Sequence, residues 1–132
     1  MEFIISDRFF LNNQAVHNPH VAPSEPSVAS SAAPIASIVM PCHNAALYVR
    51  ESVQAILAQT LSDFELIIVE DASKDNSLAL VQTLVGLDPR IRLIVHDRNL
   101  GASRSRNDGL HAARGEFIGF CDADDLWKPD KL

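Results

Sequence analysis

The sequence predicts an α/β fold with a mostly parallel sheet flanked by helices, and three observations support this prediction. Apolar stretches of strand length alternate with amphipathic stretches of helix length from about residue 35 to residue 121. Residues 64 to 69 are almost continuously apolar, which is typical of a parallel strand covered on both faces. The alternation repeats often enough to require parallel strands joined by right-handed crossovers.

Length and composition are those of one globular domain that does not bind nucleic acid. The chain has 132 residues, 47% of them hydrophobic, and a formal charge of -6. Its basic residues are scattered apart from Arg104, Arg106 and Arg114, so no basic face for nucleic acid is expected. Cys42 and Cys121 fit no metal or disulfide pattern, which indicates small buried residues and a reducing compartment.

We expect a cytoplasmic protein, with peripheral attachment at the inner membrane face left open. The start of the chain shows no basic leader followed by a secretory apolar segment. No stretch approaches the ~20 apolar residues of a spanning helix.

Residues 1 to 34 are predicted to be a flexible N-terminal tail and linker. The later part of this segment is rich in proline, serine and alanine and cannot bury enough apolar surface to order itself. Apolar residues between positions 3 and 11 could dock on the domain or on a partner. Residues 35 to 132 are then the folded domain.

The first strand is expected at residues 36 to 40, ending at Pro41 because proline has no N–H for a central ladder. Apolar side chains recur at helical spacing over residues 47 to 57, which predicts the first crossover helix with Leu47 on its buried face.

The second strand is expected at residues 64 to 69. A second helix follows, with Asp75 or Asn76 as its cap and Gly86 near its end.

A third strand at residues 91 to 95 precedes a third helix at residues 102 to 113. Gly115 ends that helix, and the last strand covers residues 116 to 121.

Three acids follow the last predicted strand directly. Asp122 and Asp124 flank the small Ala123, so their carboxylates can converge on one point, where they repel each other unless a cation is present. Hard divalent ions prefer carboxylate oxygen, which predicts a Mg²⁺ or Mn²⁺ site. A solvated aspartate-rich turn that includes Asp125 and caps a helix before Pro129 explains the same residues about equally well.

The loops after the first, second and fourth strands open on one edge of such a sheet, where ligands bind in α/β folds. Residues 41 to 44, 70 to 73 and 122 to 125 should therefore be neighbours. Asp71 could accept hydrogen bonds from a nucleobase or a ribose, although a turn or capping role is as well supported by its local sequence. Arg106 could bind a diphosphate, and a solvated helix face is the alternative.

Several motifs resemble glycosyltransferase family 2, a group with the GT-A fold. They are PCHN at residues 41 to 44, ED at residues 70 and 71, SRN at residues 105 to 107, and DAD at residues 122 to 124. The resemblance runs from about residue 37 to residue 132. It implies a GT-A type, Rossmann-like sheet, a nucleotide-diphospho-sugar donor, Mn²⁺ or Mg²⁺ as cofactor, and a hydroxyl acceptor that is a saccharide or lipid-linked.

The resemblance also implies roles for single residues on the nucleoside side. The family's turn matches Pro41, Cys42 and Asn44, which would line the nucleoside. Its paired acids match Glu70 and Asp71, and Asp71 aligns with the carboxylate that contacts the base.

On the phosphate side, the resemblance makes Asp124 the direct metal ligand and Asp122 a contact to ribose or metal. Arg106 matches the arginine of the family's A-R-N segment, although Ser105 stands in place of the alanine.

Family members carry a further half that binds the acceptor and supplies the general base. No residue here matches that base, so the resemblance places it beyond Leu132 and implies no catalytic residue within this sequence. The sequence therefore resembles a truncated, donor-binding half of a transferase that inverts the anomeric carbon, as is usual in the family.

A non-catalytic binding or interaction fragment is the main alternative. A nucleotidyltransferase is disfavoured because no glycine-rich basic loop follows the first strand. An uncovered part of the sheet would predict self-association.

Overall fold

The computed structural model describes residues 3–5, by their main chain alone, and residues 32–132. Most of the predicted tail and linker lies outside the described residues. The elements are β1 (Phe3–Ile5), β2 (Ala36–Cys42), α2 (Val49–Leu57), β3 (Phe64–Asp71), α3 (Ser77–Leu87), β4 (Ile91–His96), α4 (Ala102–Ala112) and β5 (Phe117–Phe120).

The described strands form one sheet in the order β1-β5-β2-β3-β4. Strands β2, β3, β4 and β5 are parallel, as predicted, and β1 pairs antiparallel with β5. Residues 3 to 5, which the sequence analysis assigned to the tail, thus extend the sheet beyond β5. The order strand-helix-strand predicted from residue 35 onward is confirmed.

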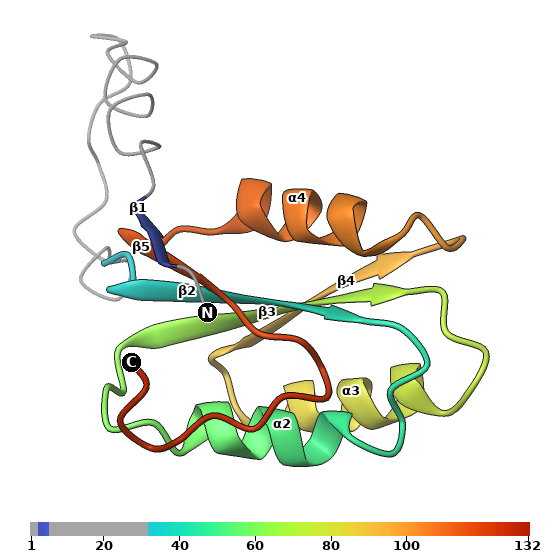
Figure 1. Ribbon diagram of the computed structural model, residues 1–132, viewed down its shortest axis with the longest axis horizontal. Coiled ribbons are helices and arrows are strands. Elements are labelled where there is room, and N and C mark those ends of the chain that lie inside the picture. The colour runs from blue at the N-terminus through green and yellow to red at the C-terminus, as the bar shows by residue number, and fades with distance from the viewer. Residues whose placement is uncertain (1–2, 6–31) are drawn as a thin grey trace, which may run out of the picture.

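The sheet is the middle of three layers (Figure 1). Helix α4 covers one face, and α2 and α3 cover the other. Alternation along β2 fits this arrangement, because Ile38 and Met40 belong to the core on the α2 and α3 side whereas Val39 belongs to the core under α4. Strand β3 is buried along its whole length, as its apolar sequence predicted.

Several predicted element boundaries are wrong by one or two residues: β3 continues to Asp71, and α4 ends at Ala112 with Ala113 as its cap, so Gly115 does not end that helix. Two further differences, at the end of β2 and at the start of α2, have a clear physical cause.

Strand β2 continues through Pro41, which pairs with Val69 of β3. The carbonyl of Val39 accepts a hydrogen bond from the Cys121 N–H, so the main-chain groups of Val39 face the β5 side. Residues two apart in a strand face the same side, so the main-chain groups of Pro41 also face β5. Pairing with β5 ends at Phe120, and a proline without an N–H therefore costs the ladder nothing there.

The second difference concerns the first helix. Leu47 is 85% exposed and lies in the turn before α2, because the N–H groups of Tyr48 and Val49 both bond to the Ala45 carbonyl and delay the helix. Val53 and Ile56 are buried as predicted.

Helix α4 packs unusually close to the sheet. A Cβ atom at Gly109 would overlap the side chain of Val39, so only glycine allows this approach. This contact sets how closely the later part of α4 approaches the middle of β2. Among the helices of residues 32–132, none has both the length and the apolar composition that a membrane span requires.

Candidate functional site

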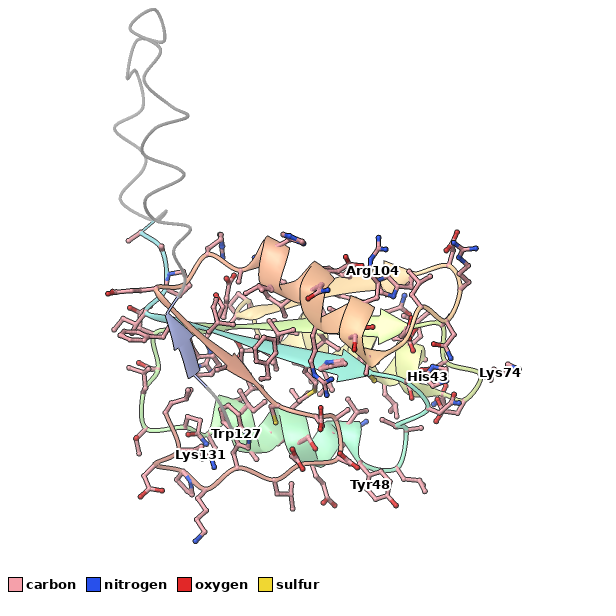
Figure 2. All side chains as sticks on the ribbon, turned by 45° about the horizontal axis from the view of Figure 1, so that its top comes forward. His43, Tyr48, Lys74, Arg104, Trp127 and Lys131 are labelled. Atoms are coloured by element: carbon pink, nitrogen blue, oxygen red, sulfur yellow. The ribbon has the colours of Figure 1, made fainter. Side chains whose placement is uncertain are left out.

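A cavity of about 450 Å³ opens at the carboxyl ends of β2 and β3, next to the start of α4. Figure 2 shows His43 at this edge of the sheet, with the turn that carries Lys74 beyond it and Arg104 of α4 on the other side. The cavity is lined by Pro41, Cys42, His43, Asp71, Asn99, Gly101, Ala102, Ser105, Arg106, Asp122, Ala123 and Asp124.

The turns after β2 and β3 hold each other. Asn44 and Ala72 both have positive φ, 49° and 53°. The Asn44 N–H donates to the Ser73 hydroxyl at 2.9 Å, and the Lys74 N–H donates to the Asn44 side-chain oxygen at 2.8 Å. Asn44 therefore shapes the rim of the cavity without lining it.

His43 lies between these turns and faces the cavity. Its Nδ1 is 2.7 Å from the main-chain oxygen of Asp71, which can only accept, so Nδ1 carries a proton. Its Nε2 lies 3.2 Å and 3.3 Å from the amide nitrogens of Asn44 and Asn99, which can only donate. His43 thus joins the turn after β2 to the end of β3 and to the loop before α4.

The carboxylate of Asp71 is buried and accepts three hydrogen bonds. Oδ1 accepts from His96 Nδ1 and from the Leu100 N–H, and Oδ2 accepts from the Gly101 N–H, all at 2.8 Å. Burial alone would raise the pKa of Asp71, but these bonds and the charge of His96 outweigh it and lower the pKa. An ionised carboxylate offers about four acceptor positions. One acceptor position of Asp71 is therefore left without a partner among the described residues.

Gly101 is in the left-handed region with φ of 92°, a conformation that side chains rarely adopt. This lets the Leu100 and Gly101 N–H groups turn together toward Asp71 just before α4 begins. The Asp71 carboxylate thus fixes where the helix starts.

The acidic turn forms the opposite wall. The Asp125 N–H bonds to the Asp122 carbonyl at 3.0 Å, and the described residues that follow contain no helix, so the helix-cap alternative is wrong. Arg106 Nη2 donates to Asp122 Oδ1 at 3.0 Å. The Asp124 carboxylate is exposed and makes no hydrogen bond or ion pair with any residue that the structure describes.

The fit of this turn to a divalent cation depends on what the ligand brings. No group of three or more His, Cys, Asp or Glu side chains in the described part of the chain could hold a metal ion by itself. Asp122 and Asp124 supply two carboxylates on one cavity wall. Mg²⁺ is commonly bound by one or two carboxylates together with substrate phosphates. The residues present therefore fit a metal that arrives with a diphosphate.

Cys42 also lines the cavity, but its thiol is not reactive. Burial, with smaller contributions from the charges of Glu70 and Asp75, raises the pKa of Cys42 to about 12. Burial and the acidic turn raise the pKa of Cys121 to about 12 as well. Both thiols stay protonated near neutral pH, which makes them poor nucleophiles.

Six of the eight site residues predicted from the sequence line the cavity: Pro41, Cys42, Asp71, Arg106, Asp122 and Asp124. Asn44 and Glu70 do not. The Glu70 carboxylate is buried and accepts the Ser73 N–H at 3.0 Å, so it supports the turn beside the cavity. The binding roles of all eight residues stay predictions.

Leu132, beyond which the resemblance places the general base, does not line the cavity. Its N–H donates to the side-chain oxygen of Gln59 at 2.9 Å, and its half-buried side chain packs against the core on the α2 and α3 side. The segment after the acidic turn therefore runs away from the cavity and along the end of α2. The position of a general base after Leu132 stays a prediction.

Sequence reasoning missed His43, Asn99 and Gly101, which line the same cavity. A signal existed for each. His43 stands inside the quoted PCHN turn, and Asn99 and Gly101 stand in the Asn-Leu-Gly segment directly before the third predicted helix.

Comparison with known proteins gives these features a context. The sequence matches the family described as "Glycosyl transferase family 2" over residues 37–132. It is 39% identical over 98 residues to the Escherichia coli protein "UDP-Glc:alpha-D-GlcNAc-diphosphoundecaprenol beta-1,3-glucosyltransferase WfgD", covering 74% of this chain and 38% of that protein.

Two solved structures share the fold. The first is Staphylococcus aureus TarS 1-349 in complex with UDP, with a TM-score of 0.68, 28% identity, and coverage of 74% of this chain and 29% of that chain. The second is the mannosyltransferase PcManGT from Pyrobaculum calidifontis in complex with GDP-Man and Mn²⁺, with a TM-score of 0.66, 24% identity, and coverage of 91% and 35%. The predicted GT-A type of fold is confirmed.

The chain spans well under half the length of these relatives. The family match nevertheless covers most of the present sequence and includes every motif that lines the cavity. The chain therefore belongs to glycosyltransferase family 2.

Proposed function

We propose that this chain is the donor-binding part of a glycosyltransferase that moves a sugar from a nucleoside-diphospho-sugar to an acceptor hydroxyl. One observation carries the proposal: the nucleoside-side residues Pro41 and Asp71 and the acids Asp122 and Asp124 line a single cavity. A nucleoside diphosphate needs groups that bind the nucleoside and acids that hold the metal of its diphosphate, both within one pocket.

The nucleoside end is formed by β2 and β3. Pro41 and Cys42 present main chain and small side chains, which suit the face of a base. Asp71 has one acceptor position left for a base or ribose donor. Asn44 and Glu70 act on this end by holding the turns, rather than by lining the cavity.

The diphosphate end is formed by α4 and the acidic turn. Asp124 and Asp122 would hold Mn²⁺ or Mg²⁺, and Arg106 adds a guanidinium at the same wall. When bound, the metal supplies positive charge that stabilises the departing diphosphate. Arg106 is placed to pair with a phosphate oxygen in exchange for Asp122.

In the transfer, an acceptor oxygen forms a bond to the anomeric carbon while the bond from that carbon to the phosphate oxygen breaks. The nucleoside diphosphate leaves with the bonding electrons. A base must take the acceptor proton, and we assign that role to none of the described residues. The acceptor is proposed to be a saccharide or a lipid-linked hydroxyl, handled in the cytoplasm, with inversion at the anomeric carbon.

The experiment is titration calorimetry with UDP, GDP and dTDP, each with and without Mg²⁺. UDP comes first because TarS and WfgD carry uridine nucleotides in their descriptions. We expect metal-dependent binding that Asp124→Ala abolishes. Asp130→Ala, which removes an exposed acid from the same segment, is the matched control. Binding heats unchanged by Asp124→Ala would reject the proposed site.

A non-catalytic fragment is the second candidate, since the chain spans only part of its relatives. Sugar-transfer assay of this chain alone separates the two, because turnover without any added protein excludes the non-catalytic role. Self-association, predicted from the sequence, is tested by size-exclusion chromatography over a range of concentrations, where a single monomer peak throughout would contradict it.

A further inference from the structure

His96 is the last residue of β4, and its ring is almost completely buried between two carboxylates. Nδ1 lies 2.8 Å from Oδ1 of Asp71, and Nε2 lies 2.8 Å from Oδ2 of Asp108. The side chains of His96 and Asp71 are 7% and 3% exposed. Of these three residues only Asp71 was predicted as a site residue, and the role predicted for it does not involve His96.

The geometry itself assigns the proton count of the ring. A neutral imidazole has one N–H, so it can donate to only one of two carboxylates and must turn a lone pair toward the other. Both contacts are hydrogen bonds only when both nitrogens carry protons. With both carboxylates ionised, the two contacts therefore require His96 to be an imidazolium.

The charges that face the ring come from two elements. Asp71 reaches it from β3 and Asp108 from α4. Arg104 Nε donates to both carboxylate oxygens of Asp108, at 3.0 Å and 3.2 Å. His43 contacts the Asp71 main-chain oxygen rather than its carboxylate. Burial by itself lowers the pKa of His96, but the bonds to Asp71 and Asp108 and their charges outweigh it and raise the pKa.

The two carboxylates belong to elements on different walls of the cavity, although only Asp71 itself lines it. Asp71 lines the cavity and receives the Leu100 and Gly101 N–H groups at the start of α4. Asp108 lies on α4, which also carries the lining residue Arg106. The ring thus connects the β3 wall to the α4 wall.

We propose that His96 is a positioning residue that clamps α4 to β3 through its two N–H groups and so holds the nucleotide cavity in its binding shape. The proposal rests on the proposed function of the cavity. Loss of one ring proton breaks one of the two bonds, whichever carboxylate is released, and removes the link between β3 and α4 that runs through His96.

The direction of the pH effect follows from the raised pKa. The clamp is complete below the ordinary histidine pKa of ~6.5 and is lost as pH rises through the higher pKa of folded His96. Nucleotide affinity should fall over the same window. We expect a loss of roughly tenfold, which is typical of one charge-assisted hydrogen bond.

Three variants test the clamp. His96→Gln has one donor group and should bind nucleotide weakly at every pH. Asp108→Asn can donate to an unprotonated Nε2 while Nδ1–H stays on Asp71, so it should keep affinity and lose the alkaline fall. His111→Gln changes an exposed histidine on α4 and should behave as the wild type.

Two measurements on the full chain are compared from about pH 6 to about pH 9, the range around the ordinary histidine pKa. Nuclear magnetic resonance of ¹⁵N-labelled protein without ligand follows the His96 ring nitrogens and the Leu100 and Gly101 amides. Calorimetry with UDP and Mg²⁺ follows affinity. A shared midpoint for ring, amides and affinity, absent in Asp108→Asn, supports the proposal.

A neutral His96 ring at pH 7 overturns the proposal. Leu100 and Gly101 amide signals that do not change while the ring titrates overturn it too. A flat affinity across that titration overturns it as well. Absence of UDP, GDP and dTDP binding at all pH values is a separate result: it rejects the proposed function, while the ligand-free ring and amide signals still decide whether the clamp exists.

Discussion

The hydroxyl of Ser52 donates a 2.8 Å hydrogen bond to the main-chain oxygen of Ala123. Ser52 is 1% exposed on α2, and Ala123 lies between the two acids proposed to hold a metal. The first crossover helix therefore anchors the acidic turn at its centre, although neither acid takes part in the bond.

Ser52→Ala should destabilise the protein and loosen this turn. It leaves the buried Ala123 carbonyl without its partner, which costs about 1–3 kcal/mol. We expect a lower urea midpoint together with weaker Mg²⁺-dependent nucleotide binding. Ser62→Ala, at an exposed serine, is the control. Nucleotide binding that stays unchanged in Ser52→Ala would show that the bond supports only the fold.

Arg106→Ala should affect ligand binding more than stability. The side chains of Arg106 and Asp122 are 39% and 53% exposed, and exposed ion pairs contribute roughly 0–1 kcal/mol. A guanidinium paired with a diphosphate is worth more, so we expect at least about tenfold weaker UDP binding with a nearly unchanged urea midpoint. Calorimetry and urea unfolding are run in parallel with Arg50→Ala, an exposed arginine on α2. An equal loss of UDP affinity in Arg106→Ala and Arg50→Ala would show that Arg106 does not bind the diphosphate.

Glu65→Gln should make stability less sensitive to acid. Burial raises the pKa of the Glu65 carboxyl, but hydrogen bonds from Ser37, Arg92 and Arg114 outweigh it and lower the pKa. A lowered pKa in the folded state adds stability above the ordinary glutamate pKa and loses it as pH falls through the folded value.

The glutamine variant should thus be less stable by about 2 kcal/mol near neutral pH, with the difference shrinking in acid. Urea unfolding at neutral pH and at about pH 4, near the ordinary glutamate pKa, measures this. Glu116→Gln, at an exposed position, should show no such change. A constant difference at both pH values would contradict the prediction.

The two cysteines should be unreactive in the folded protein. Both are buried free thiols with a pKa of about 12, so the thiolate that attacks disulfide reagents is scarce near neutral pH. We expect negligible reaction with an aromatic disulfide reagent in buffer and reaction of two thiols per chain in urea. Rapid labelling of one thiol without urea would show that the cavity exposes Cys42.

The sequence predicted the parallel part of the fold well because periodicity and burial operate locally. The all-apolar run of β3 and the spacing of Val49, Val53 and Ile56 in α2 need no knowledge of distant contacts. The pairing of β1 with β5 joins the two ends of the chain, and no local pattern indicates it.

The candidate site divides in the same way. The sequence indicates Asp122 and Asp124 because acids directly follow an apolar strand. It does not indicate His96 and Asp108, since their meaning depends on a helix packing over a strand end. Leu47 was misplaced because apolar spacing begins before the residue at which the main chain becomes helical.

The facing turns that contain Asn44 and Ala72 have a mechanical consequence. Each is kept in its left-handed conformation by hydrogen bonds to the other, so neither can rearrange alone. They form one rigid lip of the cleft. A ligand that enters the cavity therefore meets these two turns as one fixed wall, and any change at one turn is passed directly to the other.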